Sequence, residues 1–269
     1  MKCIGAICGD CIGFPMEFNN NKYMDYEPFS MGSHFTDDTV MTIANMKWLL
    51  SGELTEERLV KEMAELGNKY WQAGYGESFY NWLSGCNGYK PYNSWGNGSG
   101  MRVSPVGWWF DTLEETLEYA GISAKVTHNH PEGIKGAKAI AAAVYLARTG
   151  HPKDEIKSFI ENRFGYDLSR TTDEIRPNYI FYVDCMRSVP ESIICFLEAD
   201  STKKAIQLAI SLGGDTDTMA DMAGAIAEAF YGDADELYEG VKTAIGGEYP
   251  EEFDNVVKEF NEKLVEITK

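Results

Sequence analysis

The sequence predicts an all-α protein, and three observations support this prediction. Apolar residues recur at helical spacing along most of the chain. Ser, Thr and acidic residues gather where the predicted helices begin, because free N–H groups and the helix dipole favour them there. The sequence lacks a series of alternating runs typical of a β-sheet, although residues 179–183 could be extended. With 269 residues, 44% of them hydrophobic, we predict one domain over residues 1–269.

Five of the predicted helices have a clear apolar face, whose members are three, four or seven positions apart. Thr55 and the acidic pair after it open the first helix. Thr112 caps the second, and Pro131 stands in the first turn of the third. The faces, in chain order, are Leu59, Met63, Leu66 and Tyr70; Leu113, Leu117, Ala120 and Ala124; Ile134, Ala137, Ala141 and Val144; Ala205, Ala209 and Leu212; and Phe253, Val256, Val257, Phe260 and Leu264.

One long irregular region, Ser84–Gly100, is rich in Gly, Asn, Tyr and Trp. A loop of this length inside a compact domain is usually functional or mobile. We therefore expect catalytic loops at one end of the helical bundle.

Composition excludes several classes of protein. The formal net charge of -18 argues against nucleic acid as a partner, because phosphate backbones are bound through Lys and Arg. No apolar run is long enough to span a bilayer, and Met1–Pro15 is broken by glycines where a leader would be continuous. Six cysteines are few for this length, so we expect reduced thiols and a cytoplasmic location. Cys8 and Cys11 have redox-motif spacing, but small buried helix residues are the better interpretation.

Two short acidic clusters carry the strongest indication of function: Thr36-Asp37-Asp38-Thr39 and Gly213-Gly214-Asp215-Thr216-Asp217-Thr218. Each precedes a predicted helix. If the fold brings them together, four carboxylates share one small space, which is unfavourable unless they protonate or a cation neutralises them. Hard oxygen ligands suit Mg²⁺, Mn²⁺ or Ca²⁺ rather than zinc. Four aspartates balance the charge of two divalent ions.

Either cluster alone has a simpler explanation, since Asp at a helix start can act as a cap. One cap needs only one carboxylate, however, so adjacent Asp37 and Asp38 exceed what capping requires. The helices after both clusters also have apolar faces, so their ends can converge in a common core. These faces are Met41, Ala44 and Trp48, and Met219, Met222, Ile226 and Phe230.

The N-terminal segment adds a third element to the predicted site. Gly5, Gly9 and Gly13 are spaced four apart, which on a helix permits close approach of a neighbouring helix or a ligand. Asp10 lies within the same segment and is costly to bury unless it is paired. Glu17 follows Pro15 in a predicted loop, where a carboxylate is more often solvated than catalytic.

Five motifs in this order resemble those of the ADP-ribosylglycohydrolase family, which includes the dinitrogenase-reductase-activating hydrolases. The resemblance extends from about Gly5 to Gly232. The motifs are Gly9-Asp10-x2-Gly13-x-Pro15-x-Glu17, Thr36-Asp37-Asp38-Thr39, Asn97-Gly98-x2-Met101-Arg102, Thr127-His128 and Gly213-Gly214-Asp215-x-Asp217-Thr218.

This resemblance implies an all-α orthogonal bundle with a binuclear Mg²⁺ or Mn²⁺ centre at helix N-termini. One ion would be held by Thr36, Asp37, Asp38 and Asp217. The second would be held by Asp215, Asp217 and Thr218, with Asp217 bridging. Glu17 matches the movable catalytic glutamate of the family, so the resemblance implies catalytic roles for Glu17, Asp37 and Asp217.

The resemblance also implies substrate-binding residues. The loop that cradles the diphosphate and outer ribose of ADP-ribose matches Ser94, Trp95, Gly96, Asn97 and Gly98. His128 matches a substrate-contacting histidine, although a lone His is more often a helix cap or core residue. We interpret His130 as structural. Arg102 could pair with a phosphate or brace the loop against a carboxylate.

The implied activity is metal-dependent hydrolysis of the C1″ glycosidic bond of ADP-ribose conjugates, carried on a protein or a small molecule. Its transition state has oxocarbenium-like charge, which nearby carboxylates stabilise. Glu17 would act as acid or base. Two alternatives stay open: a metal-dependent phosphatase or nucleotide hydrolase, and a catalytically silent ADP-ribose binder or structural protein. The acceptor linkage, the choice between Mg²⁺ and Mn²⁺ and the oligomeric state do not follow from the sequence.

Overall fold

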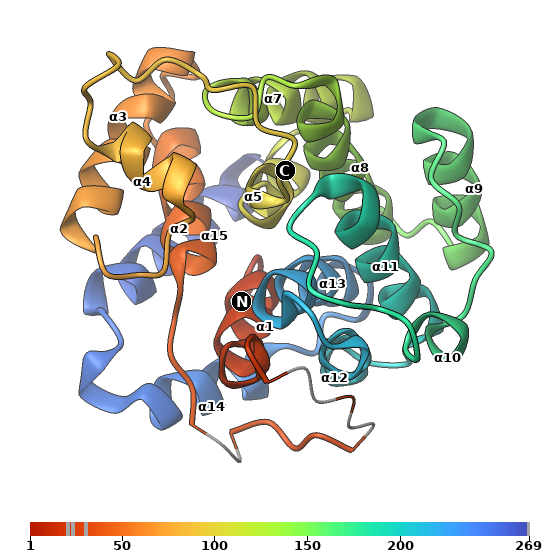
Figure 1. Ribbon diagram of the computed structural model, residues 1–269. Helices are drawn as coiled ribbons and strands as arrows, with labels where there is room; N and C mark the ends of the chain where they lie inside the picture. Colours follow the sequence, from red (N-terminus) through yellow and green to blue (C-terminus); the bar gives the residue numbers. More distant parts are fainter. Residues whose placement is uncertain (20–21, 23–24, 30–31, 268–269) are drawn as a thin grey trace.

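The computed structural model describes residues 1–19, 22, 25–29 and 32–267. Within these ranges the regular structure is helical (Figure 1), apart from isolated β-bridge residues: Gly96 pairs with Asp184, and Gly32 also lies in a bridge. The prediction of an all-α orthogonal bundle is confirmed. None of the helices in the described part of the chain has the length and apolar character needed to cross a membrane.

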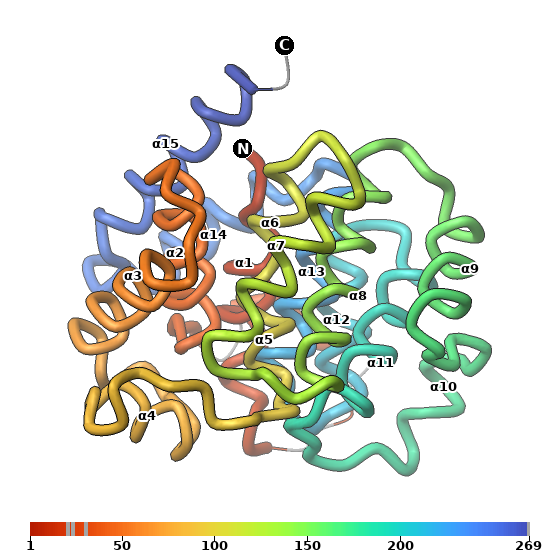
Figure 2. Tube along the Cα trace, turned by 90° about the horizontal axis from the view of Figure 1, so that it is seen from above, coloured from red at the N-terminus to blue at the C-terminus, as the bar shows by residue number. Residues whose placement is uncertain are grey.

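The chain folds into fifteen α-helices and two short 3-10 helices over its described residues. Helices α1 and α13 lie at the centre, with α2, α3, α14 and α15 on one side and α8 to α11 on the other (Figures 1 and 2). The helices are α1 (Gly5–Gly13), η1 (Phe14–Met16), α2 (Asp37–Leu50), α3 (Glu56–Lys69), α4 (Glu77–Leu83), α5 (Gly98–Met101), α6 (Ser104–Trp109), α7 (Leu113–Lys125), α8 (Pro131–Arg148), α9 (Lys153–Phe164), α10 (Thr172–Ile175), α11 (Cys185–Glu198), α12 (Thr202–Leu212), α13 (Thr216–Tyr231), α14 (Asp235–Ile245), η2 (Gly246–Glu248) and α15 (Glu251–Ile267).

The predicted helix starts agree with the structure. Thr55 caps α3 by accepting a hydrogen bond from the backbone N–H of Arg58, at 3.2 Å. Thr112 caps α7 in the same way, and Pro131 is the first residue of α8. Ser84–Gly100 is irregular as predicted until α5 begins at Gly98. Residues 179–183 form no strand.

Helix α1 packs unusually closely on α13, and its three glycines make this possible. A Cβ atom on Gly9 would lie 2.1 Å from the carbonyl oxygen of Ala220, closer than any real contact. Cβ atoms on Gly5 and Gly13 would similarly meet backbone atoms of α13, at 2.3 Å and 2.6 Å. The glycine spacing therefore serves helix–helix approach, the first of the two uses expected from the sequence.

Two hydrogen-bonded contacts fix the register of α1 against α13. The carboxylate of Glu228 in α13 accepts the backbone N–H groups of Ile4 and Gly5 at the start of α1, at 3.0 and 2.8 Å. Burial raises the pKa of Glu228 to about 7. At the other end, the hydroxyl of Thr216 donates to the carbonyl oxygen of Gly13, at 3.0 Å. The end of α1 is thus held beside the start of α13.

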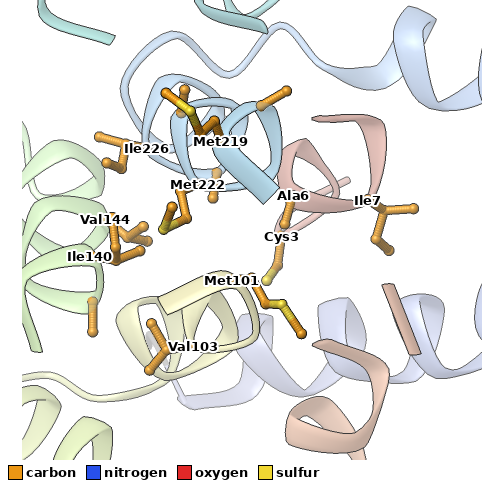
Figure 3. Packing of buried hydrophobic residues seen from close by; sticks show 14 of the residues in the cluster. Cys3, Ala6, Ile7, Met101, Val103, Ile140, Val144, Met219, Met222 and Ile226 are labelled. Carbon is orange, nitrogen blue, oxygen red and sulfur yellow. The ribbon is translucent and has the colours of Figure 1, made fainter. Parts of the chain in front are cut away.

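The hydrophobic core surrounds this central pair. Figure 3 shows Met222 and Ile226 of α13 facing Val144 and Ile140 of α8, with Met101 of α5 close by. All of these side chains are buried.

The cysteines of α1 belong to the same core. Cys8 and Cys11 are free thiols with no exposed surface, and burial raises their pKa well above the usual range. They are small buried helix residues, as the sequence suggested.

The C-terminal helices complete the same bundle. Helix α15 packs on α2, and its Phe253 contacts Phe35 edge to face, with ring centroids 5.3 Å apart. Phe253, Val257 and Phe260 are fully buried, as the predicted apolar face requires.

The glycine contact predicts a specific sensitivity to one added methyl group. Gly9→Ala should lower the free energy of unfolding by about 3 kcal/mol or more, because backbone atoms on both helices must move apart. Gly247→Ala is the matched control, since its Cβ would meet nothing within 4 Å, and it should change stability by less than about 0.5 kcal/mol. Urea denaturation measures both. Equal stabilities of the two variants would contradict the proposed packing constraint.

Candidate active site

The two acidic clusters converge on one cavity of about 710 Å³. Both stand at helix N-termini: Thr36 is the N-cap residue of α2, and Asp215 occupies the same position in α13. The metal ligands implied by the sequence resemblance all line this cavity, and so does Glu17. They are Thr36, Asp37, Asp38, Asp215, Asp217 and Thr218.

Helix capping does not account for these carboxylates. The cap of α2 is the hydroxyl of Thr36, which accepts the backbone N–H of Asp38 at 3.2 Å. The side chain of Asp215 makes no capping hydrogen bond to α13. One oxygen of Asp38 is buried without a hydrogen-bond partner. An unpaired buried carboxylate oxygen is costly, so another group must satisfy it.

Asp10 has a different role from the carboxylates of the cavity. It is fully buried in α1 and accepts the backbone N–H groups of Thr36 and Thr39, at 2.9 and 3.0 Å. It also accepts both threonine hydroxyl groups. Burial raises the pKa of Asp10, while these four hydrogen bonds oppose the shift. Asp10 therefore anchors the start of α2 to α1, which is the pairing its burial requires.

The electrostatics of the cavity are strongly unfavourable in the absence of a cation. Burial raises the pKa of Asp37, Asp38, Asp215 and Asp217, and neighbouring carboxylates add to the shift for all of these except Asp215. Burial, followed by the charges of Asp215 and Asp10, raises the pKa of Glu17 to about 7. The protein thus concentrates acidic groups where burial, and for most of them the neighbouring charges, oppose ionisation.

The available ligand atoms fit a hard cation. One oxygen each from Glu17, Asp215 and Asp217 lies within 4.8 Å of the other two. Neither His nor Cys joins this group among the described residues. Together with the unpaired oxygen of Asp38, this is an oxygen-only donor set, which suits Mg²⁺, Mn²⁺ or Ca²⁺.

The amide of Asn97 orients one of these carboxylates. Its Nδ2 donates to Oδ2 of Asp215 at 2.7 Å, and its backbone N–H donates to the carbonyl oxygen of Val183 at 2.9 Å. The sequence resemblance implies a substrate contact for Asn97. The structure places its side-chain amide on Asp215, so this residue links the loop to the acidic cluster.

A second wall of the cavity is formed by Ser94, Gly96, Asn97, Gly98 and His128. A Cβ on Gly98 would lie 3.1 Å from Nε2 of His128, and one on Gly96 would lie 3.5 Å away. Both glycines therefore lie beside this nitrogen, and a side chain at Gly98 would crowd it.

Trp95 departs from the rest of the predicted loop, because it does not line the cavity. Its half-exposed ring instead packs edge to face on His130, with centroids 5.4 Å apart. Its neighbour Gly96 pairs with Asp184 in an isolated antiparallel bridge. Gly96 lines the cavity, whereas the ring of Trp95 does not.

His128 is buried, and its Nδ1 lies 2.7 Å from the hydroxyl of Thr127. Burial, with the nearby charge of Arg102, holds the pKa of His128 well below its usual value. His130 caps α8 by accepting the backbone N–H of Glu132 at 3.2 Å, which agrees with its structural interpretation.

Arg102 braces the site, but not against a carboxylate as one expectation held. Its buried guanidinium donates to the carbonyl oxygen of Ser123 at 2.7 Å and to the hydroxyl of Thr127 at 2.9 Å. Burial lowers the pKa of Arg102 to about 10. Both of these acceptors are neutral oxygen atoms.

Sequence reasoning missed a third wall, which includes residues 72–74 and 76–79 and the rings of Tyr92, Phe14, Phe18 and Phe181. The carbonyl oxygen of Ala73 accepts the backbone N–H of Asp37 at 2.8 Å and so ties this wall to α2. No local pattern marked these residues. Only the aromatic residues themselves, next to Glu17 and in residues 179–183, could have drawn attention to this wall.

Comparisons with known proteins agree with this architecture. The family model described as ADP-ribosylglycohydrolase matches residues 3–266, so the match includes the C-terminal helices beyond Gly232. The chain is 30% identical to ADP-ribosylhydrolase ARH3 of Mus musculus over 305 aligned positions, covering 85% of this chain and 82% of that protein. It is 25% identical to ADP-ribosylarginine hydrolase Tri1 of Pseudomonas putida, covering 85% and 69%.

A solved structure has the same fold. It is described as an ADP-ribosylglycohydrolase-related protein complex and has a TM-score of 0.74 at 20% sequence identity, covering 96% of this chain and 94% of the other. The helical architecture, the convergence of the acidic helix ends and the match over residues 3–266 lead to one conclusion: the chain belongs to the ADP-ribosylglycohydrolase family.

Proposed function

We propose that the protein is a metal-dependent hydrolase that cleaves the C1″ glycosidic bond of ADP-ribose conjugates and releases ADP-ribose. The observation that carries this proposal is the meeting of Glu17 with Asp215 and Asp217 in a cavity that also contains the glycine loop and His128. Family membership supports ADP-ribose hydrolysis in general. The cavity volume of about 710 Å³ is within the range of sites for cofactor-sized ligands.

Six residues would hold two divalent cations, Mg²⁺ or Mn²⁺: Thr36, Asp37, Asp38, Asp215, Asp217 and Thr218. The raised pKa values and the unpaired oxygen of Asp38 support this assignment, since both are relieved by positive charge. When bound, such ions can orient sugar hydroxyls and lower the pKa of a water molecule. Asp37 and Asp217 would be catalytic through this role.

Glu17 is the proposed acid–base residue. Burial is the first cause of its raised pKa, and this cause remains when cations offset the neighbouring carboxylates, so the carboxyl group is suited to holding a proton for transfer. Its position beside Asp215 and Asp217 puts it next to the proposed reaction centre. It would exchange a proton, through a carboxyl oxygen, with the leaving group or with the attacking water.

His128 is proposed to bind the diphosphate as a neutral donor. The hydroxyl of Thr127 accepts a hydrogen bond from Arg102 and can give its own proton to Nδ1 of His128. The ring proton then resides on Nε2, which faces Gly96 and Gly98. Together with Ser94 and the two glycines, it would bind the phosphate oxygens of ADP-ribose.

Activity is tested by incubating the protein with Mg²⁺ or Mn²⁺ and ADP-ribose linked to arginine, serine or acetate. We expect release of free ADP-ribose from at least one conjugate. Glu17→Gln should lower kcat by about a hundredfold or more, because proton transfer is lost while the shape of the side chain is kept. Chromatography identifies the products. AMP with ribose phosphate would instead indicate a nucleotide hydrolase, and no product from any conjugate would favour a silent binder.

Metal binding is tested by thermal unfolding with Mg²⁺, Mn²⁺ or a chelator. We expect either ion to raise Tm by several degrees, because binding to the folded state relieves repulsion. Asp38→Asn should raise Tm of the metal-free protein and reduce the ion-induced shift. Asp25→Asn, at an exposed position that does not line the cavity, is the matched control and should leave both values unchanged. Identical shifts in the two variants would contradict the ligand assignment.

The low pKa of His128 predicts that its ring charge does not change between pH 8 and pH 6. Because its folded-state pKa lies well below 6.5, the ring should stay neutral as the pH falls from 8 to 6, whereas the unfolded chain takes up a proton in this range. This group therefore adds stability at high pH that is lost as the pH decreases. NMR of the labelled ring nitrogens measures the charge. Protonation with a midpoint near 6.5 would contradict the proposed neutral donor.

A further inference from the structure

Exposed apolar side chains gather at the mouth of the cavity. Among the large hydrophobic residues that are exposed in the described ranges, Phe14, Phe18, Phe181 and Val183 line the cavity. Large hydrophobic side chains that stay in water beside a binding site mark a surface that a ligand covers. The metal and phosphate roles proposed above use none of them.

Two of these residues form a defined structure. The rings of Phe18 and Phe181 stack with centroids 5.9 Å apart and planes 18° apart. They come from distant parts of the chain, and yet 84% of Phe18 and 44% of Phe181 stay exposed. We call these two residues the aromatic pair. Its broad faces offer apolar contact area at little cost in conformational entropy.

The place of the aromatic pair identifies what it would contact. Phe18 directly follows Glu17, whose carboxylate stands beside Asp215 and Asp217. From Phe181 the chain continues to Val183, whose carbonyl oxygen binds the backbone of Asn97 in the glycine loop. The aromatic pair therefore lies near Glu17. Two residues after Phe181, the chain at Val183 borders the proposed phosphate site. The acceptor portion of a conjugate must lie beside Glu17, because this residue is proposed to exchange a proton with the leaving group.

We propose that the aromatic pair is an acceptor subsite, which favours ADP-ribose carried on a polypeptide with an apolar side chain beside the modified residue. This inference rests on the proposed function and adds the class of acceptor. A small hydrophilic acceptor such as acetate would leave both rings in water. An adjacent apolar side chain would remove them from water, and burial of one such side chain is sufficient for about a tenfold difference in affinity.

Binding to a slow variant tests the subsite without turnover. In a Glu17→Gln background, calorimetry compares two peptides that carry ADP-ribose on the same arginine, flanked by leucines in one and by serines in the other. A pair linked through serine is measured in parallel. We expect the leucine-flanked peptides to bind about tenfold more tightly. Phe181→Ser should reduce this ratio to about one, and Phe181→Leu should keep most of it.

Val183→Ser and Val265→Ser form a matched pair, since 53% of the first and 61% of the second side chain is exposed. Val265 lies on α15, away from the cavity lining, so Val265→Ser should leave the ratio unchanged. Val183→Ser should lower it. Both sites are exposed, so circular dichroism should find all variants folded.

Several outcomes would overturn the inference: equal affinities of the two peptides, no binding of either, or a ratio that survives Phe181→Ser. Conversion of a dimer to a monomer by Phe181→Ser would also overturn it, because the pair would then be a contact between copies. Failure of the proposed function has a separate readout. A preference for leucine-flanked peptides without ADP-ribose release by the unsubstituted protein would contradict hydrolysis and leave the subsite in place.

Discussion

The burial of several carboxylates around one cavity is the constraint on which this structure depends. Asp37, Asp38, Asp215 and Asp217 line one cavity, with pKa values raised chiefly by burial. Folding must bring these groups together against their charges, and the energy for doing so comes from the apolar core around α13 (Figure 3). A site assembled at such cost is suited to positive charge, which is why the acidic helix ends are the natural place for a cation.

The position of α1 determines where these charges meet. Its glycines allow backbone contact with α13, and Glu228 and Thr216 fix its two ends along that helix. From this fixed helix, Asp10 binds the start of α2 through Thr36 and Thr39. Helix α1 therefore holds the N-termini of α2 and α13 together, although none of its own residues, Gly5–Gly13, lines the cavity.

Much of the fold was predictable because the signals are local. Thr55, Thr112 and Pro131 mark helix starts through hydrogen bonding or backbone preference of their own segments. The convergence of Asp37 with Asp215 was also predictable, since charge balance and five ordered motifs agreed. Family membership is confirmed by the match over residues 3–266.

The features of the site that the sequence did not predict depend on side-chain directions and on partners far apart in the chain. Trp95 packs on His130 and does not line the cavity, and a sequence motif does not encode which side chains of a loop enter a site. The partners of Asn97 and Arg102 lie in other helices or loops, at Asp215 and Ser123. Contacts such as the stacking of Phe18 on Phe181 arise only when separate segments meet in space.

Titration with Mn²⁺, followed by the electron paramagnetic resonance signal of the free ion, tests the central claim most directly. The account predicts saturable binding of two ions per chain, and loss of at least one of them when Asp217 is replaced by Asn. A free-ion signal that rises in proportion to added Mn²⁺ from the first addition, as in buffer alone, would contradict it.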